Sequence, residues 1–276
     1  MIHSIHHLVV ATPNLETAVA DYEVLFARPP DGAIETEGAR QVWFSTTNVR
    51  FVLTAPSGPG AAGDAVRARL GSNGEGLWRI AFGVDDLAKT SNLFERRGLT
   101  PGPSFAMPIE GRGGADAAPA CSLALPATHG VEMALVEARR NPGVAAADAG
   151  VSGLDHVVIR TPDPERAVAL YGARLGLDMR LDRSNPAWGA RLIFFRCGDL
   201  VVEIAHELKS GVSQSPDWFG GLSWRAPDLA ATRARLLAHG RNLSDIRKGR
   251  RPGSHVCTLR DGTANTPTIL LGLDPA

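Results

Sequence analysis

An internal duplication is the feature that most constrains how this chain can fold. Residues 5–22, which begin Ile-His-His-Leu-Val-Val-Ala-Thr-Pro, recur 149 positions later within residues 153–171. A second block, residues 38–53, aligns without gaps on residues 189–204. The first block of each copy has the pattern of a β-branched strand, a Thr-Pro turn, an Asn or Asp cap and an amphipathic helix. A period this long indicates two copies of a domain and not a solenoid, whose units are much shorter.

Each copy contains the order β-α-β-β-β twice, which gives four βαβββ units and an α+β fold. The units begin near residues 4, 77, 154 and 218, and frame 86–98 of the second aligns with frame 228–240 of the fourth. The expected helix caps are Asn14, Asp86, Asp163 and Asp228. We expect an N-terminal domain at residues 1–138, a linker at 139–150 and a C-terminal domain at 151–276, each domain with two units.

Charge and composition exclude several classes of function. Lys plus Arg and Asp plus Glu number 29 each, so the formal net charge is zero and neither nucleic acid nor an anionic membrane is an expected partner. No apolar run approaches the ~18–20 residues that span a bilayer. The three cysteines lack CxxC spacing, and residues 1–4 do not resemble a signal peptide. We expect a cytoplasmic protein with a small-molecule partner, and leave a homodimer open.

A histidine on the first strand and a glutamate on the last strand of paired βαβββ units give the chain a family resemblance. The residues that carry it are His7, Glu132, His156 and Glu203. The chain resembles the vicinal oxygen chelate superfamily, which includes glyoxalase I, methylmalonyl-CoA epimerase, extradiol dioxygenases and the bleomycin and fosfomycin resistance proteins. The resemblance implies two domains, each a curved mixed eight-stranded sheet with helices on its convex face. It also implies a divalent metal on the concave face.

The resemblance implies that His7, Glu132, His156 and Glu203 are metal ligands, and that Glu132 or Glu203 also moves a proton as a catalytic group. Imidazole and carboxylate suit a hard or borderline divalent ion, but the pattern does not choose among Zn, Ni, Co, Mn and Fe, or no metal at all. A bound ion would stabilise an enediolate-like anion. The flanking residues are apolar on both strand faces, so each carboxylate needs a metal, a cation or a proton as its partner.

Other residues are candidates for contact with substrate. Arg79 takes the histidine position of the second unit, and His255 lies on an expected strand of the fourth. The basic run 247–251 is able to bind an anionic substrate, although a solvated loop is the commoner role for such a run. Residues 104–120 are rich in Gly, Pro and Ala, which predicts a mobile loop near a cavity mouth.

Several expected ligand positions hold residues that do not bind metals. The number of ligands in each cavity therefore depends on which units pair. Val52 replaces a ligand in the first unit, and the fourth has Gly221 and a residue near Thr268. The iron ligand set of a ring-cleaving dioxygenase is therefore incomplete, which disfavours that reaction. Pairing in chain order leaves one His and one Glu per cavity, with Arg79 beside Glu132. Crosswise pairing would instead gather Glu132, His156 and Glu203 on one metal. The short linkers favour chain order.

These observations favour a small-molecule enzyme of the glyoxalase or epimerase type, a lyase or isomerase that forms an enediolate-like anion. The alternative is a metal-free binding or drug-sequestration protein that uses the same concave sheet.

Overall fold

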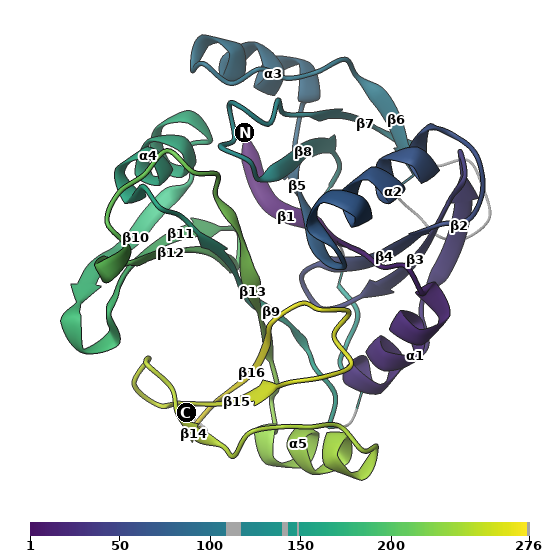
Figure 1. Cartoon of the computed structure of the whole chain (residues 1–276), viewed down its shortest axis with the longest axis vertical. Helices are drawn as coiled ribbons and strands as arrows, with labels where there is room; N and C mark the ends of the chain where they lie inside the picture. Colours follow the sequence, from purple (N-terminus) through teal and green to yellow (C-terminus); the bar gives the residue numbers. More distant parts are fainter. Residues whose placement is uncertain (109–116, 140–142, 148, 275–276) are drawn as a thin grey trace.

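The computed structural model describes residues 1–108, 117–139, 143–147 and 149–274, which form two mixed eight-stranded sheets (Figure 1). The N-terminal sheet has the order β2-β3-β4-β1-β5-β8-β7-β6, and the C-terminal sheet has the order β10-β11-β12-β9-β13-β16-β15-β14. The predicted pairing of units in chain order is therefore confirmed. In both sheets the first strands of two units lie side by side at the centre, and each pairs in parallel with the last strand of its own unit.

The strands recur in the same order in all four units. The N-terminal sheet contains β1 (Ile2–Ala11), β2 (Gly32–Thr36), β3 (Ala39–Ser45), β4 (Arg50–Pro56), β5 (Gly76–Val84), β6 (Phe105–Pro108), β7 (Ala117–Ser122) and β8 (Glu132–Glu137). The C-terminal sheet contains β9 (Gly153–Arg160), β10 (Asp178–Asn185), β11 (Ala190–Cys197), β12 (Leu200–Glu207), β13 (Trp218–Arg225), β14 (Arg247–Lys248), β15 (Ser254–Leu259) and β16 (Thr268–Leu273).

The described residues form five α-helices, four of which begin directly after a predicted cap. They are α1 (Leu15–Phe26), α2 (Ala61–Asn73), α3 (Leu87–Arg96), α4 (Pro164–Val168) and α5 (Leu229–Ala238), with a π-helical turn η1 (Ala169–Arg174) after α4 and short 3₁₀ turns η2 (Pro186–Trp188) and η3 (Leu208–Ser210). All four predicted caps are confirmed, because each side chain accepts a hydrogen bond from the backbone N–H three residues later. Gly98, with φ of +73°, follows the end of α3 in the left-handed conformation.

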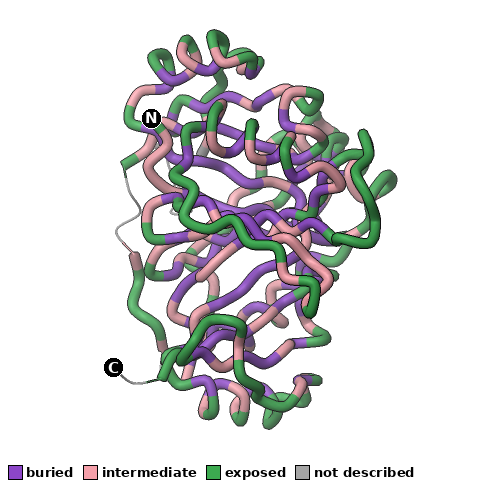
Figure 2. Tube along the Cα trace, turned by 90° about the vertical axis from the view of Figure 1, so that its left-hand side faces the viewer, coloured by how far each residue is buried: buried purple, intermediate pink, exposed green. Residues whose placement is uncertain are grey.

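The two sheets share one apolar core. Trp224 of β13 packs edge-on against Phe26 of α1 and Phe51 of β4, with ring centroids 5.0 and 5.7 Å apart. The Arg235 guanidinium of α5 donates to the carbonyl oxygen of Leu25 at 3.0 Å. One continuous cluster of buried side chains therefore runs from one sheet into the other, and the buried segments follow the strands through the middle of the molecule (Figure 2).

Helix α2 departs from the expected arrangement. The convex face of the N-terminal sheet packs against α1 and α3, but α2 lies on the opposite, concave face. Its Val66, only 2% exposed, packs in a cluster with Val9, Trp43 and Val52 from three strands. The prediction that all helices lie on the convex face is wrong for this helix. The concave face of the N-terminal sheet is consequently covered by its own chain, whereas that of the C-terminal sheet remains open.

Residues 104–120, predicted as a loop, are partly a β-hairpin. Phe105–Pro108 pairs with residues 117–120, which makes these two strands the edge of the N-terminal sheet. The rest of the predicted loop, residues 109–116, lies outside the described residues. In the part of the chain that the structure describes, no helix is long and apolar enough to cross a membrane.

Candidate functional site

The concave face of the C-terminal sheet lines a cavity of about 1950 Å³. Alternate residues of the central strands point into it, as the two-residue period of a strand requires. The wall of the cavity nearest the third unit consists of His156, Val158 and Arg160 from β9, Leu192 and Phe194 from β11, and Val201, Glu203 and Ala205 from β12. This wall is mainly apolar, and it contains few charged side chains. The position of those few groups determines what chemistry the cavity supports.

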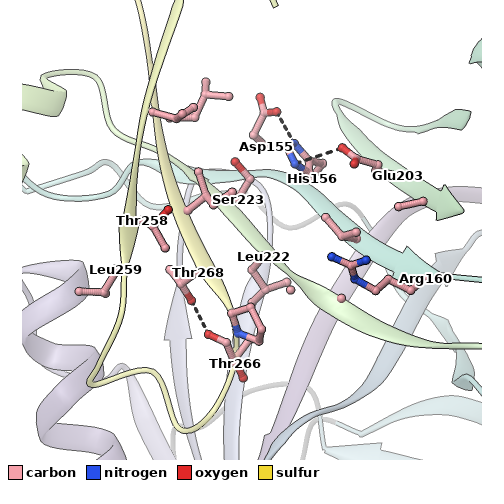
Figure 3. A pocket seen from close by; sticks show the side chains of 18 of the residues that line it. Asp155, His156, Arg160, Glu203, Leu222, Ser223, Thr258, Leu259, Thr266 and Thr268 are labelled. Atoms are coloured by element: carbon pink, nitrogen blue, oxygen red, sulfur yellow. Dashed lines mark hydrogen bonds and ion pairs between the residues drawn. The ribbon is translucent and has the colours of Figure 1, made fainter. Parts of the chain in front are cut away.

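His156 and Glu203 face each other inside this cavity (Figure 3). The distance from His156 Nε2 to Glu203 Oε2 is 3.4 Å, and the two side chains are 19% and 11% exposed. Their strands are adjacent and parallel, with Glu203 opposite Val158 and His156 opposite Val201, so the two side chains are diagonal neighbours on one face. The prediction that these residues lie together and face one cavity is confirmed.

Asp155 holds the other side of the same imidazole. Its Oδ2 lies 2.8 Å from His156 Nδ1, and its Oδ1 accepts a hydrogen bond from Arg225 Nε at 3.3 Å. Two consecutive strand residues normally face opposite sides of a sheet, but here β9 contains a bulge. Ser223 pairs with His156 and Trp224 with Leu154, so Asp155 is the extra residue. A bulge of this kind redirects a side chain, and bulges are frequent beside active sites.

The ionisation state of Asp155 determines which nitrogen of the His156 imidazole carries a proton. Burial raises the pKa of the Asp155 carboxyl, but hydrogen bonds and charge interactions with His156 and then Arg225 outweigh burial, so its pKa is lowered. An ionised carboxylate only accepts hydrogen bonds, so His156 must carry its proton on Nδ1. Nε2 then faces the Glu203 carboxylate across 3.4 Å. The arrangement is a carboxylate–imidazole–carboxylate relay that opens on the cavity.

The N-terminal sheet contains the same bulge but different chemistry. Ile5 pairs with Phe82 and His7 with Ala81, so His6 is the extra residue and occupies the position equivalent to Asp155. The Nδ1 atoms of His6 and His7 lie 2.8 Å apart. Burial lowers the pKa of both imidazoles, that of His6 to about 4. His7 is thus a buried neutral partner of His6 in the other sheet, and the structure does not bring it to the other three candidate metal ligands.

Arg79 and Glu132 form the ion pair predicted for chain-order pairing. Arg79 Nη2 lies 3.9 Å from Glu132 Oε2, and the guanidinium carbon lies 4.6 Å from the Trp78 ring centroid. The side chains are 24% and 28% exposed, so the pair is partly buried. Burial lowers the pKa of Arg79, and the charge of Glu132 opposes this effect. Both residues belong to the N-terminal sheet, so neither joins His156 and Glu203 as a metal, catalytic or substrate contact.

The structure does not place His255, a predicted substrate contact, among the residues that line this cavity. Ser254, Val256 and Thr258 of β15 line the cavity, so His255 between them points away from it. Its Nδ1 lies instead 3.0 Å from Asp274 Oδ1. The strand was predicted correctly. Which of its alternate residues face the cavity depends on its register with β16, and the sequence does not show that register.

The donor set does not fit a resident divalent metal. His156 and Glu203 supply one nitrogen and one carboxylate, while Asp155 is already hydrogen-bonded to His156 and Arg225. Catalytic sites for such ions usually combine three protein ligands with an open position. Across the described ranges, no group of three or more His, Cys, Asp or Glu side chains is placed to hold a metal ion.

Paired βαβββ units with a site on the concave sheet are the arrangement expected from the family resemblance, and comparison with known sequences points to the same family. The family model described as the glyoxalase/bleomycin resistance protein/dioxygenase superfamily matches residues 155–258, a segment that contains Asp155, His156 and Glu203. Residues 155–258 thus match the superfamily that the chain was predicted to resemble.

Individual relatives differ in the reactions that their names describe. The ethylmalonyl-CoA/methylmalonyl-CoA epimerase of Cereibacter sphaeroides is 29% identical over 99 residues, which cover 33% of this chain and 72% of that protein. A mutant of 4-hydroxymandelate synthase from Streptomyces coelicolor matches with a TM-score of 0.74 and 15% identity, covering 100% of this chain and 94% of that one. The Mn(II)-bound glyoxalase of Novosphingobium aromaticivorans matches with a TM-score of 0.69 and 11% identity, covering 99% and 84%. At these identities the two structures show a common fold alone.

Proposed function

We propose that this protein is a proton-transfer enzyme, an isomerase or lyase that acts on a small carbonyl compound in the cavity of the C-terminal sheet. The observation that carries the proposal is the contact between His156 and Glu203, held by Asp155 at the wall of that cavity. The sequence similarity to an epimerase supports a reaction of this kind, because epimerisation removes a proton from carbon and returns it.

In this mechanism Glu203 removes a proton from the carbon next to the carbonyl group. The carbon–hydrogen bond breaks, an oxygen–hydrogen bond forms on the carboxyl, and the electron pair moves to the carbonyl oxygen as an enolate. His156 accepts or shares the proton through Nε2, since Asp155 fixes its other nitrogen as a donor. Returning the proton to the other face gives an epimer, and loss of a leaving group gives a lyase.

Arg160 is the residue that we assign to the developing negative charge. It lies on the same face of β9 as His156, four residues further along, and it lines the cavity (Figure 3). Arg160 is exposed at the cavity wall, so it offers the enolate a positive charge and guanidinium donors but not a buried charge. Because the donor set lacks a third metal ligand, we assign this task to Arg160.

The test is exchange of carbon-bound hydrogen in D₂O, followed by ¹H NMR. A panel of 2-substituted malonyl thioesters, 2-hydroxy acids and 2-oxo acids would be incubated with the wild-type protein. We expect one class to exchange, and Glu203→Gln to slow that exchange at least ~100-fold, the lower end of what a general base contributes. Glu132→Gln is the matched control, because Glu132 was the other candidate base and lies in the other sheet; it should exchange at the wild-type rate. Equal rates for wild type and Glu203→Gln would refute the assignment.

The alternative function is a binding or sequestration protein, and the large cavity with its apolar wall favours it over a purely structural role. In that case a bound compound would be recovered without deuterium at any carbon, and Glu203→Gln would bind it as tightly as the wild type does. The same NMR samples therefore separate the two functions.

A further inference from the structure

The open side of the C-terminal sheet is bordered by two edges that come from different units. One edge is β10 with the turn η2, and the other is the segment 247–251 around β14 (Figure 1). Trp188 of η2 connects them, because its ring lies 5.3 Å from the guanidinium carbon of Arg183 and 5.1 Å from that of Arg250. All three residues line the cavity, so they form part of its rim.

The rim carries more positive charge than its neighbours neutralise. Arg183, Arg247, Arg250 and Arg251 are exposed rim residues, and none lies within ion-pair distance of a carboxylate among the described residues. By contrast Arg180, on the same strand as Arg183 but outside the cavity lining, pairs with Asp178 at 2.9 Å. Arg183 and Arg250 both contact the ring of Trp188, so their guanidinium carbons are at most about 10 Å apart. Several guanidinium groups on one rim, without a carboxylate partner, are suited to receive an anion.

We propose that this rim binds a phosphate group at the end of the substrate that does not react. The proposal rests on the proposed function, since it assumes that the reacting end lies at Glu203. Guanidinium groups bind phosphate through two parallel hydrogen bonds each, and a dianion can engage two arginines at once. A substrate with only one carboxylate would leave most of this charge uncompensated. A phosphorylated metabolite therefore fits the rim better than a simple carboxylic acid.

The register of the strands gives the span that such a substrate must bridge. Glu203 of β12 pairs with Phe194 of β11, which pairs with Leu181 of β10, and Arg183 lies two residues beyond Leu181. Two strand spacings across and two residues along correspond to about 12 Å between the backbones of Glu203 and Arg183. The phosphate of the substrate should accordingly lie on the order of 10 Å from the carbon that loses its proton.

The test uses inorganic tripolyphosphate as the probe, followed by calorimetry and by tryptophan fluorescence. We expect the wild type to bind it with an affinity that falls as salt rises, and Arg183→Ala/Arg250→Ala to bind at least tenfold more weakly. Arg180→Ala is the matched control and should bind as the wild type does. Trp188→Phe should keep most of the binding measured by calorimetry but lose most of the fluorescence change.

Three results would overturn the proposal: no binding by the wild type, unchanged binding by the double variant, or an equal loss in Arg180→Ala, which would indicate unspecific attraction. Glu203→Gln separates this inference from the proposed function. It should bind tripolyphosphate normally whether or not Glu203 is a catalytic base, so the rim and the proton transfer can fail independently. All substituted rim residues are exposed or partly exposed, and thermal unfolding would confirm that each variant is folded.

Discussion

Replacement of Trp224 by alanine should uncouple the two sheets. Trp224 is fully buried and contacts Phe26 and Phe51 across the boundary between the sheets. Truncation of a buried tryptophan removes apolar contacts and leaves a cavity, which costs about 3–5 kcal/mol. The two edge-on ring pairs account for about 0.5–1.5 kcal/mol each beyond the buried area. We therefore expect Trp224→Ala to lose about 3–5 kcal/mol of the free energy of unfolding.

Trp224→Phe should lower the free energy of unfolding much less than Trp224→Ala. The indole Nε1 of Trp224 is buried and has no hydrogen-bond partner among the described residues. An unsatisfied buried donor costs about 1–3 kcal/mol, which Trp224→Phe would recover while losing part of the ring. The two effects oppose each other, so the net change should stay within about 1.5 kcal/mol.

The assay is urea denaturation followed by far-UV circular dichroism, together with hydrogen exchange of the backbone amides. Wild type and Trp224→Phe should unfold in one transition, whereas Trp224→Ala should show two, with faster exchange in both sheets. Trp218→Ala is the control, since Trp218 lies on the same strand but is 52% exposed and should change stability by less than about 1 kcal/mol. A loss below 1 kcal/mol in Trp224→Ala, or faster exchange in one sheet alone, would refute the idea of a shared core.

Two further predictions concern the N-terminal sheet. Arg79→Ala should cost about 1–3 kcal/mol in urea denaturation, less than the roughly 3–5 kcal/mol of an enclosed ion pair, because both partners are partly exposed; a change near zero would show that the pair and the stacking on Trp78 contribute nothing. Acid should also destabilise the fold, because the pKa of His6 is about 4 in the folded protein and near the ordinary 6.5 when unfolded, so the unfolded chain binds more protons between these values. His6 alone should account for a fall of up to about 3 kcal/mol from pH 7 to pH 4, and His6→Gln should show a smaller fall than the wild type; identical pH profiles would contradict this account.

The repeated sequence predicted most of the fold because each of its signals is local. The caps at Asn14, Asp86, Asp163 and Asp228 and the two-residue alternation of the strands depend on neighbouring residues only, and all four caps are confirmed. The contact of His156 with Glu203 followed from their first-strand and last-strand positions, because these strands are adjacent within each unit.

The role of Asp155 was missed because strand alternation assumes an unbroken register. That rule places Asp155 and His156 on opposite faces, but the bulge in β9 brings their side chains together. A signal was present: the pair His6-His7 stands where the second copy has Asp155-His156, so both copies place two polar residues at this point of an otherwise apolar strand. Bulges depend on the partner strand, which the sequence of β9 alone does not reveal.

The position of α2 was missed for a different reason. The apolar residues of α2 are too sparse in the sequence to show which face of a sheet it covers. Only Gly63 and Val66 of α2 are buried.

Under the proposed function, the covered face of the N-terminal sheet sets how many ligands one chain binds. Duplication created two sheets of the same design, but α2 fills the space in one of them with Val66 and its neighbours. A chain with two open sheets would titrate with two equivalents of ligand and allow one site to influence the other. This chain should instead saturate at one equivalent along a simple hyperbola, so that any sigmoidal response would have to arise between chains and not within one.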